Sequence, residues 1–254
     1  MIRVLVVQVR STKSVVVRNK MKAKTKTKVV VVGGAGFIGS NLVNALVKKN
    51  FDVHVIDNLV SGKKENVNKK AKLHIVDILK PKSIQPIING SSYLFHLAAL
   101  PRVQYSIEHP LKTNAVNVEG TLNVLKASSQ AGVKKVIYSA SSSAYGDQKK
   151  MPLKESFPAN PKSPYGLQKY IGELYCQLWS EIYSLPTVCL RYFNVYGPGQ
   201  SDEGAYALVI AKFLKQRSQG KPMTITGNGK QTRDFTSVHD VVRANLLAMR
   251  SNKV

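Results

Sequence analysis

The sequence predicts an α/β protein with a doubly wound parallel sheet, followed by a small second lobe. Two observations lead to this fold class. Runs of β-branched residues alternate with helical segments from residue 28 onward, which is typical of parallel strands joined by crossover helices. The first run is followed by a glycine-rich turn and a helix, as at the start of many doubly wound sheets. The 254 residues suffice for one large α/β domain with an appendage.

Six strands are expected, and the first is the clearest. Residues 29–32 are all valine, as expected for a parallel strand that is buried on both faces. The other strands are predicted at 53–56, 73–76, 93–97, 135–138 and 187–191. Helices between them are predicted at 40–49, at 110–131 and from 163 onward. Ser163 caps the last of these and Pro164 stands in its first turn. Together these elements form a predicted domain over 28–199.

The two ends of the chain differ from this domain. Residues 1–27 are expected to be a disordered basic extension; an organellar transit peptide, or a true start at Met21, are the alternatives. Residues 200–254 contain a predicted helix at 204–218, a short strand at 223–226 and a helix at 238–250. We expect this second segment to be a partial substrate-binding lobe, truncated at Val254.

The composition favours a cytoplasmic protein without a membrane anchor. No apolar run reaches the roughly 18–20 residues of a membrane-spanning helix. Cys176 and Cys189 show no metal-ligand spacing, so they are expected to be reduced core residues and no metal is expected. The net charge of +24 is explained first by a solvated lysine-rich surface, and no specific nucleic-acid partner is expected. Attraction of an anionic substrate or adventitious nucleic-acid binding are the alternatives.

The glycine turn predicts a dinucleotide site. Gly33, Gly36 and Gly39 let the backbone turn tightly and approach a pyrophosphate, which then lies at the positive end of the next helix. Asp57 follows 18 residues after the last glycine, where a carboxylate accepts hydrogen bonds from the adenosine ribose. Because a carboxylate repels a 2′-phosphate, NAD is favoured over NADP. Lys63 and Lys64 leave NADP as an alternative.

A second pattern predicts proton-transfer chemistry. Tyr165 and Lys169 stand four residues apart near a helix start and so share one face. A nearby ammonium is expected to lower the pKa of the phenol, so that the tyrosine can take a proton from a substrate hydroxyl. The fifth strand leads into a run of serines that includes Ser141 and Ser142, whose hydroxyls are expected to point into the ligand crevice.

Taken together, nine segments carry a family resemblance. They are G-G-A-G-F-I-G at 33–39, D-N-L at 57–59, V-D-I at 76–78, H-L-A-A at 96–99, N-V-E-G-T at 117–121, S-S-S-A-Y-G-D at 141–147, S-P-Y-G-L-Q-K at 163–169, R-Y-F-N-V-Y-G-P-G at 191–199 and R-D-F-T-S-V-H-D at 233–240. From about residue 28 onward the chain resembles the extended short-chain dehydrogenase/reductase family with its NAD-binding Rossmann fold. Within it, the resemblance is closest to the NAD-dependent epimerase/dehydratase group, and there to 4-epimerases of UDP-glucose and UDP-N-acetylglucosamine.

The resemblance implies a role for each site residue. The implied catalytic residues are Tyr165 as base, Lys169 on the nicotinamide ribose, and Ser141 or Ser142 on the sugar 4-hydroxyl. The implied NAD-binding residues are Gly33, Gly36, Phe37, Ile38, Gly39, Asp57, Asn58, Asp77, Ile78, Leu97, Ala98, Ala99, Asn117, Ser139, Tyr165 and Lys169. Asn194 and Arg233 are implied to meet the diphosphate of a UDP-sugar; a surface ion pair of Arg233 with Asp234 or Asp240 is the alternative.

The serine run favours epimerisation over related reactions. Dehydratases and decarboxylases of the group are expected to carry an acid there, whereas this chain has only hydroxyls. The alternatives are another NAD-dependent epimerase, dehydratase or reductase acting on a sugar nucleotide, or a Rossmann binding module with impaired catalysis. The helices near 110–131 and 165–184 are where relatives pair, so a homodimer is expected. Family members continue beyond the R-D-F segment, which puts the residues that select the sugar in doubt.

Overall fold

The computed structural model describes residues 25–201, 209–225 and 227–252, and its centre is a parallel sheet. Six strands lie in the order β3-β2-β1-β4-β5-β6, and every neighbouring pair is parallel. Their bounds are β1 (Lys28–Val32), β2 (Asp52–Asp57), β3 (Lys72–Ile75), β4 (Tyr93–His96), β5 (Lys135–Ser141) and β6 (Thr187–Tyr192). Because the order reverses beside β1, the sheet is doubly wound, which confirms the predicted fold class.

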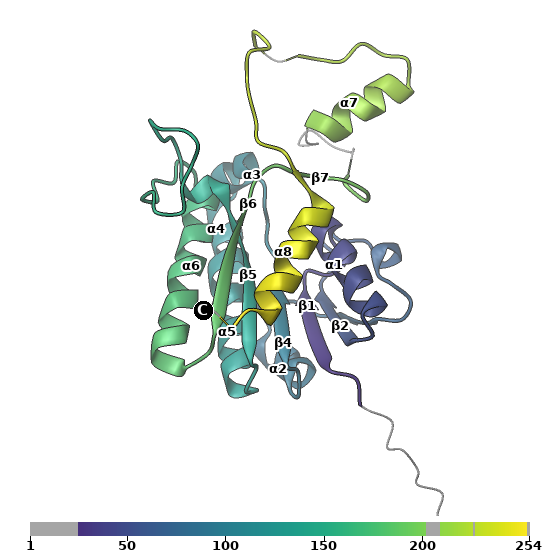
Figure 1. The fold of residues 1–254 in the computed structure, drawn as a ribbon, viewed down its shortest axis with the longest axis vertical. Helices are drawn as coiled ribbons and strands as arrows, with labels where there is room; N and C mark the ends of the chain where they lie inside the picture. Colours follow the sequence, from purple (N-terminus) through teal and green to yellow (C-terminus); the bar gives the residue numbers. More distant parts are fainter. Residues whose placement is uncertain (1–24, 202–208, 226, 253–254) are drawn as a thin grey trace, which may run out of the picture.

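Helices cover both faces of this sheet (Figure 1). The α-helices of the described residues are α1 (Phe37–Lys48), α2 (Pro81–Ile88), α3 (Val103–Glu108), α4 (Pro110–Asn114), α5 (Gly120–Gln130), α6 (Pro164–Tyr183), α7 (Val209–Ser218) and α8 (Val238–Arg250). The apolar faces of α2, α5 and α6 pack into one core cluster, and those of α1 and α8 pack into the other. The four valines of β1 contribute to both clusters, because successive side chains of a strand point to opposite faces.

Helix α8 belongs to the core of the sheet domain, although the sequence placed it in the substrate lobe. Val242, Ala248 and Met249 pack with Val29 and Leu42 in the same cluster. Every third or fourth position of α8 is apolar, and this face is buried where α8 lies beside α1. Within the lobe predicted over 200–254, residues 238–250 therefore pack on the sheet domain. Helix α7, from the same predicted lobe, lies away from the sheet (Figure 1). The predicted extension over 1–27 lies outside the described residues, apart from 25–27.

Several element boundaries differ from the sequence prediction. The strand predicted at 223–226 is wrong: residues 223–225 form no strand, because they are exposed and have no neighbouring strand to pair with. The helix predicted at 110–131 is continuous but contains a π-helical turn, η2 (Ala115–Glu119). Helices α2 and α3 were not predicted, and residues 204–208 of another predicted helix lie outside the described residues.

A second, two-stranded sheet positions the chain beyond β6. Here β7 (Val195–Tyr196) pairs in parallel with β8 (Thr236–Ser237). This pairing brings Asn194 beside the segment that contains Arg233, although 38 residues separate the two in the sequence. The small sheet therefore creates a pocket that neither segment forms alone.

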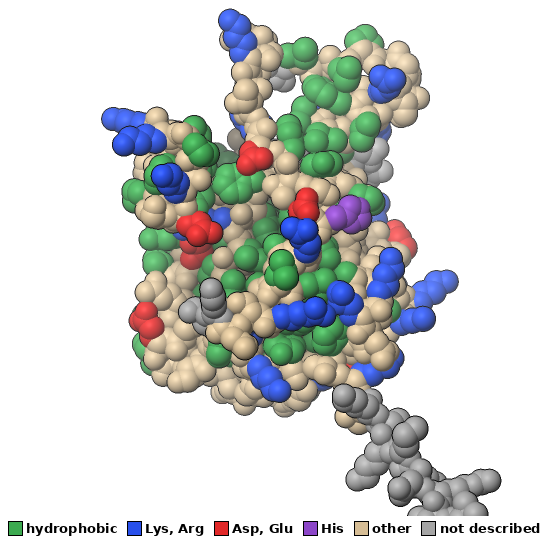
Figure 2. Space-filling model, viewed as in Figure 1, with side chains coloured by type: hydrophobic (Ala, Val, Ile, Leu, Met, Phe, Trp, Pro, Cys, Tyr) green, Lys and Arg blue, Asp and Glu red, His purple; other side chains and the backbone are tan. Residues whose placement is uncertain are grey.

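The surface view shows how the positive charge is distributed. On the face shown in Figure 2, Lys and Arg side chains are spread among hydrophobic and uncharged polar ones, and acidic side chains are few. This distribution fits the expected solvated surface on the visible face. In the part of the chain that the structure describes, no helix is long and apolar enough to cross a bilayer.

Candidate active site

The glycine turn after β1 is closed on one side and open on the other. A side chain at Gly33, whose φ is +84°, would place its Cβ 2.5 Å from the amide nitrogen of Ala98. A side chain at Gly39 would collide with the carbonyl oxygen of Gly33. At Gly36, by contrast, the nearest atom outside its chain neighbours is that same oxygen, 3.5 Å away. The packing of the chain therefore explains Gly33 and Gly39, whereas Gly36 faces free space.

The start of α1 offers an anion-binding site at this open side. Gly36 is the N-cap residue, and among the described residues no side chain caps this end of the helix. Phe37 and Ile38 form that turn, and both lie against β7 and α8 in a small apolar cluster. Uncapped amides at the positive end of a helix suit a phosphate group, so the turn fits the pyrophosphate of a dinucleotide.

Asp57 and Asp77 are fixed by backbone amides at the ends of β2 and β3. The Asp57 carboxylate accepts hydrogen bonds from the amides of Ala35 at 2.9 Å and Leu59 at 2.9 Å. Asp77 accepts one from the amide of Leu79 at 2.9 Å and one from the Asn58 side chain at 3.0 Å. Each carboxylate oxygen keeps a free lone pair, so this group fits an adenosine ribose and base. The structure thus brings together three of the predicted NAD-binding residues.

Other residues predicted to bind NAD lie deeper than the sequence suggested. The side chain of Ile78 is buried against Gly120, which leaves its backbone as the part that can reach a ligand. Asn117 is buried too. Its side-chain oxygen accepts a hydrogen bond from the Leu100 amide at 2.8 Å, and its side-chain nitrogen donates to the Leu100 carbonyl oxygen at 3.2 Å. It also donates to Gln168 at 2.8 Å. Asn117 therefore holds the loop of Leu97, Ala98 and Ala99 against α6.

Tyr165 lies buried at the start of α6, where two serines accept hydrogen bonds from the backbone. Ser163 accepts from the Gly166 amide at 3.1 Å, and Ser106 of α3 accepts from the Tyr165 amide at 3.1 Å. Burial raises the pKa of Tyr165, and a hydrogen bond with the Ser141 hydroxyl opposes this rise. Ser141 also accepts from the Ser143 amide at 3.2 Å, at the start of η3 (Ser142–Ala144). One hydroxyl thus joins the serine run to the phenol.

Lys169 is buried four residues further along the same helix. Its ammonium donates to the carbonyl oxygen of Ser139 at 2.7 Å and lies 4.8 Å from the centre of the Tyr138 ring. Burial lowers the pKa of Lys169 to about 8. The sequence predicted that Lys169 lowers the pKa of Tyr165, whereas the shift in the structure is upward, because burial is the larger influence on this phenol. We call Ser139, Ser141, Tyr165 and Lys169 the Tyr165 site.

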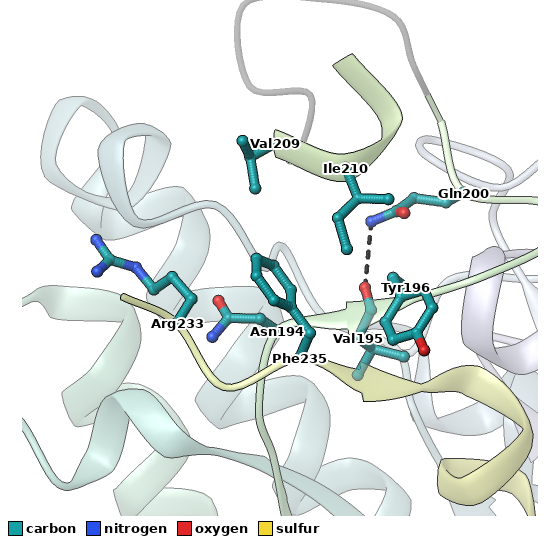
Figure 3. A pocket seen from close by; sticks show the side chains of 8 residues that line it. All are labelled: Asn194, Val195, Tyr196, Gln200, Val209, Ile210, Arg233 and Phe235. Carbon is teal, nitrogen blue, oxygen red and sulfur yellow. Dashed lines mark hydrogen bonds between the residues drawn. The ribbon is translucent and has the colours of Figure 1, made fainter. Parts of the chain in front are cut away.

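Asn194 and Arg233 line a separate pocket of about 230 Å³ (Figure 3). Its lining residues are Asn194, Val195, Tyr196, Gln200, Val209, Ile210, Arg233 and Phe235. Asn194 donates to the carbonyl oxygen of Asp234 at 3.0 Å, and Arg233 donates to that of Thr232 at 2.7 Å. The alternative of an ion pair between Arg233 and Asp234 or Asp240 is not seen among the described residues. We call this group the Arg233 pocket.

A match to a family model identifies the protein family of this chain. The model described as the NAD-dependent epimerase/dehydratase family matches residues 29–254. The chain belongs to this family. Its members use NAD, and the open glycine turn and the carboxylates described above fit that cofactor.

Individual members of the family are closely similar. A putative UDP-glucose 4-epimerase of Methanocaldococcus jannaschii is 41% identical over 224 residues, which is 87% of this chain and 73% of that protein. The UDP-N-acetylglucosamine 4-epimerase of Methanobrevibacter ruminantium, solved with UDP-N-acetylmuramic acid, is 42% identical with a TM-score of 0.86, covering 89% of this chain and 74% of that one. The UDP-glucose 4-epimerase of Thermotoga maritima, solved with UDP-glucose, is 41% identical with a TM-score of 0.86, covering 88% and 74%.

Some residues that contact the predicted site residues or their neighbours were not predicted. Ser106 lies on a helix that the sequence did not indicate, and no local pattern links it to Tyr165. Arg191 forms a two-bond ion pair with Glu173, at 2.9 and 2.6 Å, and lies 4.2 Å from the Tyr145 ring centre. The sequence contained a hint of this pair. Glu173 stands one helical turn after Lys169, on the same helix face, and Arg191 stands three residues before the predicted site residue Asn194.

Proposed function

We propose that this chain is an NAD-dependent 4-epimerase of UDP-hexoses or UDP-N-acetylhexosamines. The observation that carries the proposal is the Tyr165 site: a phenol, an ammonium and a serine hydroxyl, with no carboxylate in the serine run. Epimerisation needs one group that removes and returns a proton, and no acid for elimination. The similarity to UDP-glucose and UDP-N-acetylglucosamine 4-epimerases at 41–42% identity supports this activity.

Tyr165 is proposed to act as the base on the sugar 4-hydroxyl. The Ser141 hydroxyl interacts with its phenol and opposes part of the rise in pKa that burial causes. Ser141 and the neighbouring Ser142 are proposed to bind the same 4-hydroxyl. Bound NAD would supply the acceptor for the hydride from C4 of the sugar and the donor that returns it. Lys169 is proposed to hold the nicotinamide ribose, since its buried ammonium has donors left beyond the Ser139 carbonyl.

The NAD site is proposed along the carboxyl ends of β1, β2, β3 and β4. Gly33, Gly36 and Gly39, with Phe37 and Ile38, would hold the pyrophosphate. Asp57 and Asn58 would bind the adenosine ribose, while Asp77 and the backbone of Ile78 would frame the adenine. Asn117, through the loop of Leu97 to Ala99, would support the middle of the cofactor.

The Arg233 pocket is proposed to hold the substrate diphosphate. A guanidinium can bind two phosphate oxygens at once, and Asn194 can add an amide donor beside it. The apolar lining, including Val209, Ile210 and Phe235, suits the flat face of a uracil ring. The net charge of +24 would help to attract this anionic substrate.

We further propose a cytoplasmic homodimer. Leu167, Leu174, Leu178 and Ile182 are 42–66% exposed and lie along one side of α6. Leu111, on the adjacent α4, is 86% exposed. A second copy of the chain is the proposed cover for this apolar face. The free thiols of Cys176 and Cys189 fit a reducing compartment.

The activity is tested by incubating the purified protein with UDP-glucose and, separately, with UDP-N-acetylglucosamine. Conversion of either into its 4-epimer, measured by proton NMR, is expected, and the Tyr165→Phe variant is the matched control. If neither sugar is converted while mass spectrometry shows bound NAD, the proposed activity is wrong. A product of altered mass would identify a dehydratase, decarboxylase or reductase instead, since epimerisation leaves the mass unchanged. Salt-sensitive RNA retention that survives Tyr165→Phe would favour a binding module.

A further inference from the structure

A line of three hydrogen bonds connects the last helix, α8, to Lys169. Asn245 of α8 donates to the Tyr192 hydroxyl at 2.7 Å. The Ser139 hydroxyl donates to the same oxygen at 3.0 Å. The carbonyl oxygen of Ser139 in turn accepts the bond from the Lys169 ammonium, at 2.7 Å. Residues from α8, β6, β5 and α6 thus form one continuous series, in which the last link is the Ser139 backbone carbonyl.

Asn245 is an unusual residue for its position. It is fully buried, on the face of α8 that also presents Val241, Val242 and Ala248 to the core. Burying an amide costs free energy that only hydrogen bonds recover, and the Asn245 side-chain oxygen has no partner among the described residues. Its amide nitrogen bonds Val241 within the same helix and Tyr192 outside it. The bond to Tyr192 is therefore the specific contact that an apolar residue here would lose.

Tyr192 occupies the centre of the series. It is the last residue of β6 and is paired in register with Ser141 of β5, while its hydroxyl bonds Ser139 two residues earlier on β5. The two residues of β5 that belong to the Tyr165 site therefore both lie against Tyr192. A tyrosine with a single anchored hydroxyl can hold the side chain of Ser139 and, through it, the direction of the Ser139 carbonyl.

We propose that Tyr192 and Asn245 are positioning residues that fix Ser139, so that its carbonyl oxygen holds the Lys169 ammonium in place for NAD and for catalysis. This inference rests on the proposed function of the Tyr165 site. Neither residue touches the reacting atoms; both act through Ser139. Without them, Ser139 is less restrained and its carbonyl is a weaker acceptor for the ammonium.

The loss has a defined consequence because Lys169 is buried. Its pKa is already lowered to about 8, and the Ser139 carbonyl is an acceptor that favours the charged form. A weaker acceptor lowers the pKa further, so that Lys169 loses its proton, and with it the proposed hold on NAD, at a lower pH. The titratable groups near Lys169 are Glu173, Cys176, Cys189, His96 and Tyr138. Removing the Tyr192 hydroxyl changes none of them.

The experiment compares Tyr192→Phe and Asn245→Leu with Tyr175→Phe as the matched control. The Tyr175 ring also packs against the core, but its hydroxyl bonds none of the described residues. Both kcat and KM are measured from about pH 6 to 10, a range that spans the ionisation of Lys169. NAD affinity is measured by calorimetry at the two ends of this range, and thermal unfolding checks the fold.

In Tyr192→Phe and Asn245→Leu, we expect the alkaline limb of the pH profile of kcat to shift to lower pH by about half to one pH unit. The loss of one hydrogen bond predicts a fall in kcat of about threefold to tenfold near pH 8, with KM for the sugar nucleotide within about twofold. NAD affinity should fall more at the alkaline end than at the acid end. In the control, the limb and the affinity should stay in place.

A double variant tests whether the two residues act in one series. If Asn245 acts through Tyr192, Asn245→Leu should shift the limb no further in the Tyr192→Phe background. Additive shifts would overturn the series, and a lower unfolding temperature with an unmoved limb would show a purely structural role. If the wild-type protein converts no UDP-sugar, the proposed function fails. The pH dependence of NAD affinity still decides the positioning role, because an unchanged profile in both variants overturns it.

Discussion

The Tyr165 site and the Arg233 pocket are held in place by different means. In the Tyr165 site, Tyr165 and Lys169 are each at least 91% buried and sit on one long helix, with hydrogen bonds from β5 and α3. The Arg233 pocket is lined by the two-residue strand β7, by α7 and by the segment before β8, with lining residues such as Val209 and Phe235 that are 40% and 42% exposed. Arg233 bonds only a neighbouring carbonyl among the contacts described.

The difference fits what each region is proposed to do. Proton transfer requires groups fixed within a fraction of an ångström, which buried side chains on regular elements provide. Binding a diphosphate requires donors that can close around it, and exposed side chains on short strands can move to do so. We therefore expect changes in the first region to affect kcat and stability, and changes in the second to affect KM alone.

The largest expected effect is that of Tyr165→Phe. Removing the proposed base should lower kcat by about a hundredfold to ten-thousandfold, with KM nearly unchanged. Stability should change by only about 1 kcal/mol, because the ring stays buried and one hydrogen bond is lost. Steady-state kinetics and urea unfolding measure both. A variant that keeps more than about a tenth of the activity would exclude Tyr165 as the base.

The next effect separates two glycines of the same turn. Gly39→Ala should lower the free energy of unfolding by about 1–3 kcal/mol, because the new methyl group collides with the Gly33 carbonyl. Gly36→Ala meets no such atom and should cost about 1 kcal/mol or less. Its main effect should be weaker NAD binding, measured by calorimetry. Equal stability losses in both would contradict the view that Gly36 faces free space.

Stability should also respond to pH through Lys169. Since its pKa in the folded protein is about 8, below the usual value of 10.5, the unfolded chain binds more protons between these values. The free energy of unfolding should therefore rise with pH from about 8 to 10.5. Lys169→Met should flatten this rise while abolishing epimerisation. Urea unfolding across this range is the measurement, and an unchanged slope in the variant would assign the rise to other groups.

The smallest expected effect concerns the Arg233 pocket. Arg233→Leu should raise KM for the UDP-sugar about tenfold, with kcat within about threefold and stability within about 0.5 kcal/mol. The exposed Arg243 of α8 is outside the pocket, so Arg243→Leu is the matched control for the loss of one positive charge. If both variants raise KM equally, general electrostatic attraction, rather than a contact with Arg233, holds the substrate.

What the sequence could predict depended on how local the signal was. The valine strand, the glycine turn and the Tyr165–Lys169 spacing lie within a few residues, and the structure brings these elements together at the sheet. The contacts of Ser106 with Tyr165 and of Asn245 with Tyr192 span 59 and 53 residues, so no local pattern reveals them. The strand predicted at 223–226 failed for the opposite reason, since a favourable local composition found no neighbouring strand to pair with.

The packing of α8 against the first strand also bears on how the protein is made. Val29 and Met249 share one core cluster, although they are 220 residues apart in the sequence. During synthesis the amino-terminal strands leave the ribosome long before α8 exists, so the face of β1 that α8 helps to cover stays incomplete until then. Closing such a distant contact is slow. The growing chain therefore presents a hydrophobic surface that chaperones can recognise during most of its translation.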